Sequence, residues 1–331
     1  MRVRFVGVWD TVDAVGLPFH LSDVLNTVVY RFKFPDQRLS PIVDEACHAL
    51  AMDDERHSFH PLLWDVRQDP NPGRIDQVWF AGAHSNVGGG YPKQGMSLVA
   101  LDWMMAKAEA AGLRLVPTDR RAYRDHANVD DKLYDPRSGA GVFYRWKVRD
   151  IAAICAQNGV APQVHVSVLE RIAHGTDDYS PGNLPFEARV VVTGDDAPAP
   201  RPSLLDLRAA QMQEVLRAPG TPAGSLLAQT RTALRAGMAS YYVYLVAVTL
   251  LALVAAGAGD ISSARVPRSS LLALPGLGLL LAYGLALVAD KRMNAVFSGF
   301  WHGRQRALRY ALKGVRLRMV ETAALAPLGQ A

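Results

Sequence analysis

The 331-residue sequence contains only two cysteines, Cys47 and Cys155, so neither a disulfide framework nor a cysteine-based zinc site can be built from it. Both lie in contexts typical of a helical core, and their scarcity favours a reduced, cytoplasmic setting. The first residues, MRVRFVGVWDTV, contain no apolar region with a cleavage site and do not form a secretory signal. The acidic residues at 53–55 lack companion ligands at fixed offsets and are interpreted as the solvated end of a helix. We expect neither a metal nor a cofactor.

Charge is absent from residues 241–258 and 269–289, which are almost wholly apolar. Each run reaches the roughly 20 residues that a helix needs to cross a hydrocarbon core, and both are predicted to be transmembrane helices. Two buried helices of a soluble core are the alternative, but two such runs would then be a large coincidence. Basic residues gather on the outer flanks, with only Arg265 and Arg268 in the connecting loop, so the positive-inside rule places both termini in the cytoplasm.

The formal net charge of +5 owes much to the last forty residues, where aromatic residues such as Trp301 and Tyr310 are interleaved with basic ones. Nucleic-acid binding is one interpretation of such a tail. Because this tail directly follows a predicted span, we expect it to lie on anionic lipid headgroups instead. The expected partners are therefore membrane lipids and not nucleic acid.

Two short apolar runs are predicted to be buried strands that end in polar residues. Residues 5–9 lead into Asp10, and residues 78–81 lead into His84 and Asn86, which three consecutive glycines follow closely. Open α/β sheets place their chemistry at the carboxyl ends of strands, and the glycines allow a close backbone approach. The alternative is a glycine-rich turn around a hydrogen-bonded core histidine.

The remaining pattern is that of an α/β protein. Apolar residues at helical spacing predict a helix over residues 42–52, and Ser97 is the expected N-cap of a helix that ends at Gly112. Residues 116–143 have no clear period and are expected to be rich in loops, and residues 188–193 are a last strand. Strand, glycine loop and helix in this order make an α/β unit.

Four stretches occur in an order that is typical of one family: FVGVWDTVDAVGLP, HALAMDDERHSFHPLLW, VWFAGAHSNVGGGY, and VHVSVLERI with YSPGNLP. Together they resemble the α/β-hydrolase domain of type VI secretion phospholipase effectors of the first lipase class, over about residues 1 to 190. The resemblance implies a Ser-His-Asp esterase that acts on phospholipid esters. It also implies a bacterial protein, for which the spans indicate the inner membrane with the hydrolase-like domain in the cytoplasm.

The resemblance assigns roles to four residues. Asp10 would be the acid at a strand end, His84 and Asn86 occupy a loop that usually reads H-S-D-V-G-G-G, and His165 would be a late histidine in the chain order Ser, Asp, His. The amide of Asn86 cannot act as an ionised partner, so either Asp10 or the position of Asn86 corresponds to the triad acid. Each of the four also has a purely structural alternative, as a turn-capping or packed polar residue.

The main departure from the family is that no G-x-S-x-G motif occurs in the sequence. We expect the nucleophile strand to lie upstream of Met1, so that this chain is the truncated, C-terminal portion of a hydrolase without esterase activity of its own. A catalytically inactive, membrane-tethered binding or scaffold module is the alternative. The expected fold is a partial α/β-hydrolase-like sheet with flanking helices, plus a C-terminal two-helix transmembrane hairpin. Its expected parts are the hydrolase-like domain at 1–193, a linker and helix at 194–235, two transmembrane helices at 236–290 and a basic cytoplasmic tail at 291–331.

Overall fold

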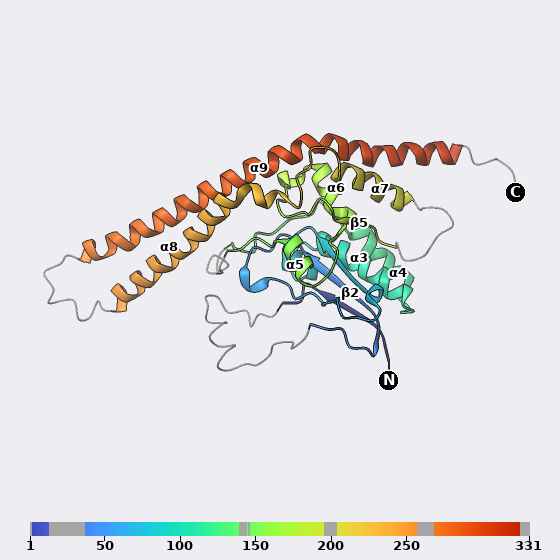
Figure 1. The fold of residues 1–331 in the computed structure, drawn as a ribbon, viewed down its shortest axis with the longest axis horizontal. Helices are drawn as coiled ribbons and strands as arrows, with labels where there is room; N and C mark the ends of the chain where they lie inside the picture. The colour runs from blue at the N-terminus through green and yellow to red at the C-terminus, as the bar shows by residue number, and fades with distance from the viewer. Residues whose placement is uncertain are drawn as a thin grey trace.

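A computed structural model describes residues 2–12, 37–138, 144, 146–194, 204–256 and 268–324. Most of the expected linker and the loop between the two expected spans lie outside these residues. The described chain forms an α/β body from which two long helices project (Figure 1). The body contains one sheet of five parallel strands in the order β1-β2-β3-β4-β5, which confirms the predicted fold class. The strands are β1 (Val3–Trp9), β2 (Val43–Ala51), β3 (Ile75–Phe80), β4 (Gln163–His165) and β5 (Arg189–Val191).

Strand β2 corrects the prediction of a helix over residues 42–52. It lies between β1 and β3, with Ala49 opposite Trp9 on one side and Val78 on the other. Residues 46–51 are all buried, because a central parallel strand is covered on both faces and is apolar at nearly every position. A continuous apolar run also contains apolar residues at helical spacing, and for this reason the segment was predicted to be a helix. Consequently Cys47 lies on a strand, and the acidic residues at 53–55 follow a strand and not a helix.

Helices cover both faces of the sheet. The predicted helix after the glycine loop is confirmed as α3, which packs Trp103 and Met104 on one face. It begins at Gly95, so the expected N-cap Ser97 lies inside the helix and does not cap it. The expected loop-rich stretch contains α4, so that prediction was wrong for its first part. Helix α4 has no apolar stripe because it buries only Arg120, which bonds Asp102 and Glu109 of α3. The α-helices of the body are α2 (His84–Gly88), α3 (Gly95–Ala110), α4 (Pro117–His126), α5 (Ile151–Gln157), α6 (Val166–His174) and α7 (Leu204–Leu216), and the 3-10 turns are His57–Phe59, Pro72–Arg74, Thr176–Asp178 and Leu226–Thr230.

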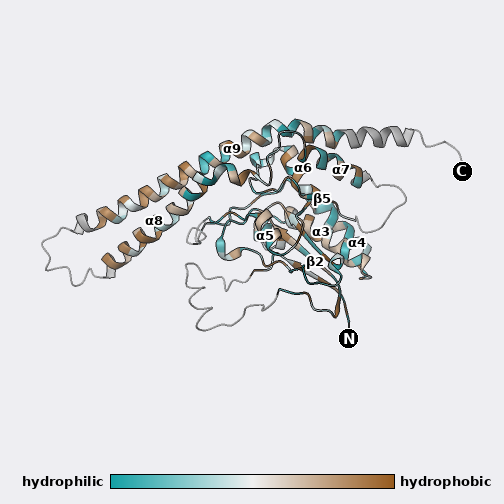
Figure 2. Cartoon of the chain, viewed as in Figure 1, coloured by the Kyte–Doolittle hydropathy of each residue, from teal (hydrophilic) through white to brown (hydrophobic). Residues whose placement is uncertain are grey.

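The two long helices, α8 (Arg231–Ala256) and α9 (Arg268–Ala324), run side by side. Both are long and apolar enough to cross a membrane. Figure 2 shows their projecting part as mostly hydrophobic, and leucines such as Leu253 and Leu280 are more than 60% exposed there. Exposed leucine on this scale is unusual for a surface in water.

Helix α9 continues beyond its apolar part and packs on the body. Its residues Met293, Phe297, Trp301 and Leu308 are buried in the main hydrophobic core with residues of α6 and α7. The indole Nε1 of Trp301 also donates a hydrogen bond to the carbonyl of Pro181 at 2.8 Å. The segment expected to be a tail is therefore, as far as it is described, a helix that docks on the α/β body.

Candidate functional site

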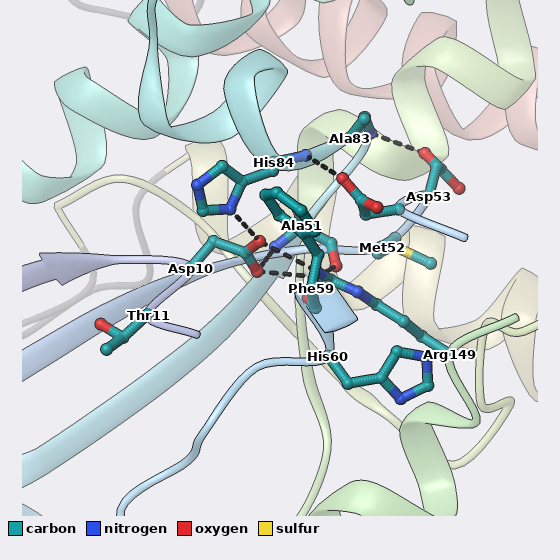
Figure 3. Close-up of polar contacts among 12 residues, drawn as sticks. Asp10, Thr11, Ala51, Met52, Asp53, Phe59, His60, Ala83, His84 and Arg149 are labelled. Carbon is teal, nitrogen blue, oxygen red and sulfur yellow. Dashed lines mark hydrogen bonds and ion pairs between the residues drawn. The ribbon is translucent and has the colours of Figure 1, made fainter. Parts of the chain in front are cut away.

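Asp10 lies at the carboxyl end of β1 and is fully buried. Its φ of +40° is uncommon for a residue with a side chain, and strain of this kind is concentrated at functional sites. One carboxylate oxygen, Oδ1, accepts hydrogen bonds from the backbone N–H of Ala51 at 2.9 Å and from Nη1 of Arg149 at 2.7 Å. The other, Oδ2, accepts from Nη2 of Arg149 at 2.9 Å (Figure 3).

His84 completes the contacts of Asp10. It is the first residue of α2, which follows β3, and its Nδ1 lies 2.7 Å from Oδ2 of Asp10 (Figure 3). The loop that carries His84 turns at Gly82, whose φ is +111° and where an added Cβ would come within 2.4 Å of Asn86 Cβ. Only glycine fits this turn. The turn places the His84 side chain at the carboxyl ends of β1 and β2.

Two carboxylates that follow β2 hold the same loop in place. Oδ2 of Asp53 accepts a hydrogen bond from the backbone N–H of Gly82 at 2.6 Å, and Oδ2 of Asp54 accepts one from that of His84 at 3.1 Å. Asp54 is fully buried and also bonds Arg56. The expectation of a solvated helix end was therefore wrong, because these acidic residues bond the loop that carries His84.

The charge state of Asp10 follows from its neighbours. Burial alone would raise its pKa, but the Arg149 guanidinium and the hydrogen bonds from Arg149 and His84 together hold the pKa of Asp10 well below its usual value. Asp10 is thus a carboxylate at neutral pH. Its Oδ2 accepts a hydrogen bond from the Nδ1–H of His84, and the proton-free nitrogen of a neutral His84 ring is then Nε2.

The His84 ring is packed on one side and open on the other. Phe59 lies edge-on to it at 5.3 Å between ring centroids, and the side chain is 29% exposed. Within the described ranges, Nε2 has no hydrogen-bond partner. A buried carboxylate, an oriented imidazole and an accessible Nε2 are the geometry of a general base.

Asn86 and His165 make their hydrogen bonds with other residues and not with Asp10 or the His84 ring. The Asn86 amide is buried, donates to the carbonyl of Lys132 at 3.0 Å and accepts from the backbone N–H of Tyr134 at 3.3 Å, so it braces the chain that follows α4. His165 ends β4, which is three strands from β1 in the sheet order, and the structure does not bring it to Asp10.

The surroundings of His165 are those of a packed side chain. It stacks on Phe80 at 4.8 Å between ring centroids, its Nδ1 lies 2.8 Å from Ser167 Oγ, and its Nε2 lies 3.2 Å from Thr193 Oγ1. Burial lowers its pKa to about 4, so the ring is neutral at physiological pH.

Arg149 is the part of the site that the sequence did not indicate. Its guanidinium is fully buried and, besides Asp10, it donates to the carbonyls of Ala51 and Phe59. One side chain therefore joins the end of β1, the end of β2 and the turn at His57–Phe59. No local sequence pattern indicates this arginine, because only the tertiary fold brings it to Asp10, which lies 139 positions earlier in the chain. Among the described residues, no group of three or more histidine, cysteine or acidic side chains could hold a metal ion.

Comparison with known proteins finds a family model that matches the N-terminal part of the chain. Residues 1–107 match the family model of the catalytic domain of T6SS, phospholipase effector Tle1-like proteins. The matched range contains Asp10, His84 and Asn86 and ends inside α3, so Arg149 and His165 lie beyond it. No curated protein and no solved structure matches the chain. The match agrees with the family resemblance that the sequence motifs indicated, and residues 1–107 are similar to the catalytic domain of type VI secretion Tle1-like phospholipase effectors.

Proposed function

We propose that Asp10 and His84 are the acid and the general base of a Ser-His-Asp esterase, and that its substrate is a phospholipid ester. The observation that carries the proposal is the 2.7 Å contact between His84 Nδ1 and a buried, ionised Asp10 whose charge Arg149 also stabilises. The match of residues 1–107 to a phospholipase catalytic domain supports the substrate class.

The proposed chemistry follows from the orientation of the ring. Nε2 of His84 takes the hydroxyl proton of a serine as its oxygen attacks the ester carbonyl, and it then gives that proton to the leaving alcohol. The acyl group is transferred to the serine and released by water, for which the same nitrogen acts as base. Asp10 keeps Nδ1 protonated and stabilises the imidazolium that forms between the two proton transfers.

The nucleophile is assigned to a segment outside these 331 residues, because no serine of the sequence lies in a G-x-S-x-G context. The two apolar helices are assigned to a membrane anchor, on the basis of their length and exposed leucines. Basic residues on the outer flanks favour the inner membrane of a bacterium, with both termini and the α/β body in the cytoplasm.

The test begins with the codons in frame upstream of Met1. If they encode a strand with G-x-S-x-G, the longer polypeptide is expressed and its release of fatty acid from phospholipid vesicles is measured. His84→Gln and Asp10→Asn should each lower the rate by about 10³-fold or more, as loss of a triad member does, while His165→Gln should leave it nearly unchanged. Loss of activity with His165→Gln but not with His84→Gln would overturn the assignment.

A membrane-tethered binding module remains the second candidate, and the absent G-x-S-x-G motif is the observation in its favour. It predicts that the 331-residue chain binds its ligand without turnover and that His84→Gln leaves that binding unchanged. A stop codon and a ribosome-binding site directly upstream of Met1 would favour this candidate.

A further inference from the structure

The candidate site lies beside the base of the helical hairpin. The indole Nε1 of Trp146 donates to Oε2 of Glu55 at 2.8 Å, and Trp146 pairs with Arg56 in a short antiparallel bridge. The other side of that indole lies against α8, where a Cβ added to Gly237 would come within 2.8 Å of the ring. Because Glu55 directly follows Asp54, which holds His84, one tryptophan separates α8 from the loops of the site.

The position of the Trp146 contact along the hairpin follows from the residues at which α8 and α9 touch each other. A Cβ added to Gly278 of α9 would meet Ala247 of α8 at 3.1 Å, which fixes the register of the two antiparallel helices. Because the helices are antiparallel, Arg235, twelve residues before Ala247, is level with Asp290, twelve residues after Gly278. Lys291 and Arg292 directly follow Asp290. The three cationic side chains are exposed and form a collar at the end of the apolar stretch.

This collar marks the level of the membrane surface in the proposed anchor. Lysine and arginine next to an apolar span are attracted to anionic headgroups. Gly237, the contact point of Trp146, lies two residues beyond Arg235 toward the apolar part of α8. The body therefore meets the hairpin at headgroup level, without any stalk between them.

The candidate site lies on the side of the body from which the hairpin projects. In Figure 1 the hairpin projects from the body toward the left, and the blue turn His57–Phe59, which lies over the His84 ring, is on the same side of the body. Helix α4 lies at the opposite end. The carboxyl ends of the strands thus point toward the side on which the proposed membrane lies.

We propose that the rim of the site at His57–Phe59 rests on the headgroups of an anionic phospholipid bilayer, the same bilayer that holds the hairpin. This inference rests on the proposed function and narrows its substrate to lipid of the adjoining leaflet. A lipid of that leaflet would bring its acyl ester to His84 without leaving the interface.

The test measures how close three positions lie to the bilayer. The full chain is placed in vesicles of phosphatidylethanolamine and phosphatidylglycerol, some carrying a nitroxide on the headgroup and others on the acyl chain. A fluorophore is attached to Ser58→Cys at the rim, to Arg121→Cys on the exposed far side of α4 as a matched control, or to Leu250→Cys in the hairpin. The native Cys47 and Cys155 are buried, and the unsubstituted chain serves as the blank for labelling.

Headgroup nitroxide should quench the label at Ser58→Cys strongly and the label at Arg121→Cys little, while acyl-chain nitroxide quenches the label at Leu250→Cys. Equal weak quenching at Ser58→Cys and Arg121→Cys, with Leu250→Cys quenched, would overturn this inference and leave the proposed anchor in place. No quenching at Leu250→Cys would overturn the anchor and this inference together. Neither result bears on the roles of Asp10 and His84 in ester hydrolysis, so the two proposals fail separately.

Discussion

Replacing Asp10 with asparagine is expected to destabilise the folded body by about 3–5 kcal/mol, because it leaves a buried guanidinium without its counter-charge. Asp10 and Arg149 are both fully buried, and two N–H groups of Arg149 donate to the two oxygens of Asp10. Asparagine has the same shape but places an NH₂ group where one oxygen accepted hydrogen bonds. The substitution therefore removes a charge and a hydrogen-bond acceptor at a fully buried point.

The measurement is urea unfolding in detergent micelles, followed through the fluorescence of the buried Trp79 and Trp103. A double-mutant cycle with Arg149→Met separates the ion pair from the loss of packing. Removing both partners should cost less than the sum of the single changes, with a coupling free energy of roughly 1–3 kcal/mol. A loss below about 1 kcal/mol for Asp10→Asn, or strict additivity, would refute the argument that this pair holds the site together.

The same ion pair predicts a pH dependence. The pKa of Asp10 is lowered in the folded state, so its contribution to stability is fully present above the unfolded value of about 4. As the pH falls below that value, the unfolded state takes up the proton first, and the contribution is lost progressively toward the folded pKa. Asp10→Asn should therefore flatten the acid limb of the stability curve, and an unchanged acid limb would contradict the low pKa.

Three further outcomes are expected. Gly82→Ala should cost about 1–3 kcal/mol in the urea assay, because φ there is +111° and the new Cβ would collide with the side chain of Asn86, and a loss of a few tenths would contradict this. Trp301→Ala should lower the free energy of unfolding by about 3–5 kcal/mol, because its ring is fully buried. Tyr310→Ala, on the exposed side of α9, should change it by no more than about 0.5 kcal/mol, and equal losses for the two variants would argue against docking of α9. Burial lowers the pKa of His165 to about 4, so the unfolded state binds its proton first as the pH falls from about 6.5 toward 4. The free energy of unfolding should therefore decline over that window, and it should decline less in His165→Gln than in the unsubstituted chain, as urea unfolding at a series of pH values would show.

The fold could be predicted where local pattern and burial agree. The strand at residues 5–9, the strand before the glycine loop and the helix after it are in place, as is the strand near residue 190. The prediction failed at β2, since a strand buried on both faces has no period to distinguish it from a buried helix. It failed again at α4, which is held by ion pairs of Arg120 and not by an apolar stripe.

The site could be predicted only in part. Asp10 and His84 each follow the carboxyl end of a parallel strand, β1 and β3, so the rule that parallel strands present polar residues at one edge was enough to select them. Their direct contact, and the position of His165 away from it, depend on strand order, which the sequence does not encode in any local way. Arg149 depends on a contact between residues 139 positions apart, and no spacing rule reaches that far.

The phase of α9 determines how the body sits relative to the proposed membrane. Met293, Phe297 and Trp301 follow one another at intervals of four residues, so they form one stripe, and that stripe is the face that docks on the body. Because α9 is continuous from the exposed leucines to this stripe, one added residue between them would turn the docking face by about 100° relative to the span. The aromatic residues of the basic segment are therefore divided by helical phase, with Trp301 buried against the body and Tyr310 exposed. The orientation of the site over the bilayer is thus carried by the spacing between an apolar span and an apolar stripe on a single helix.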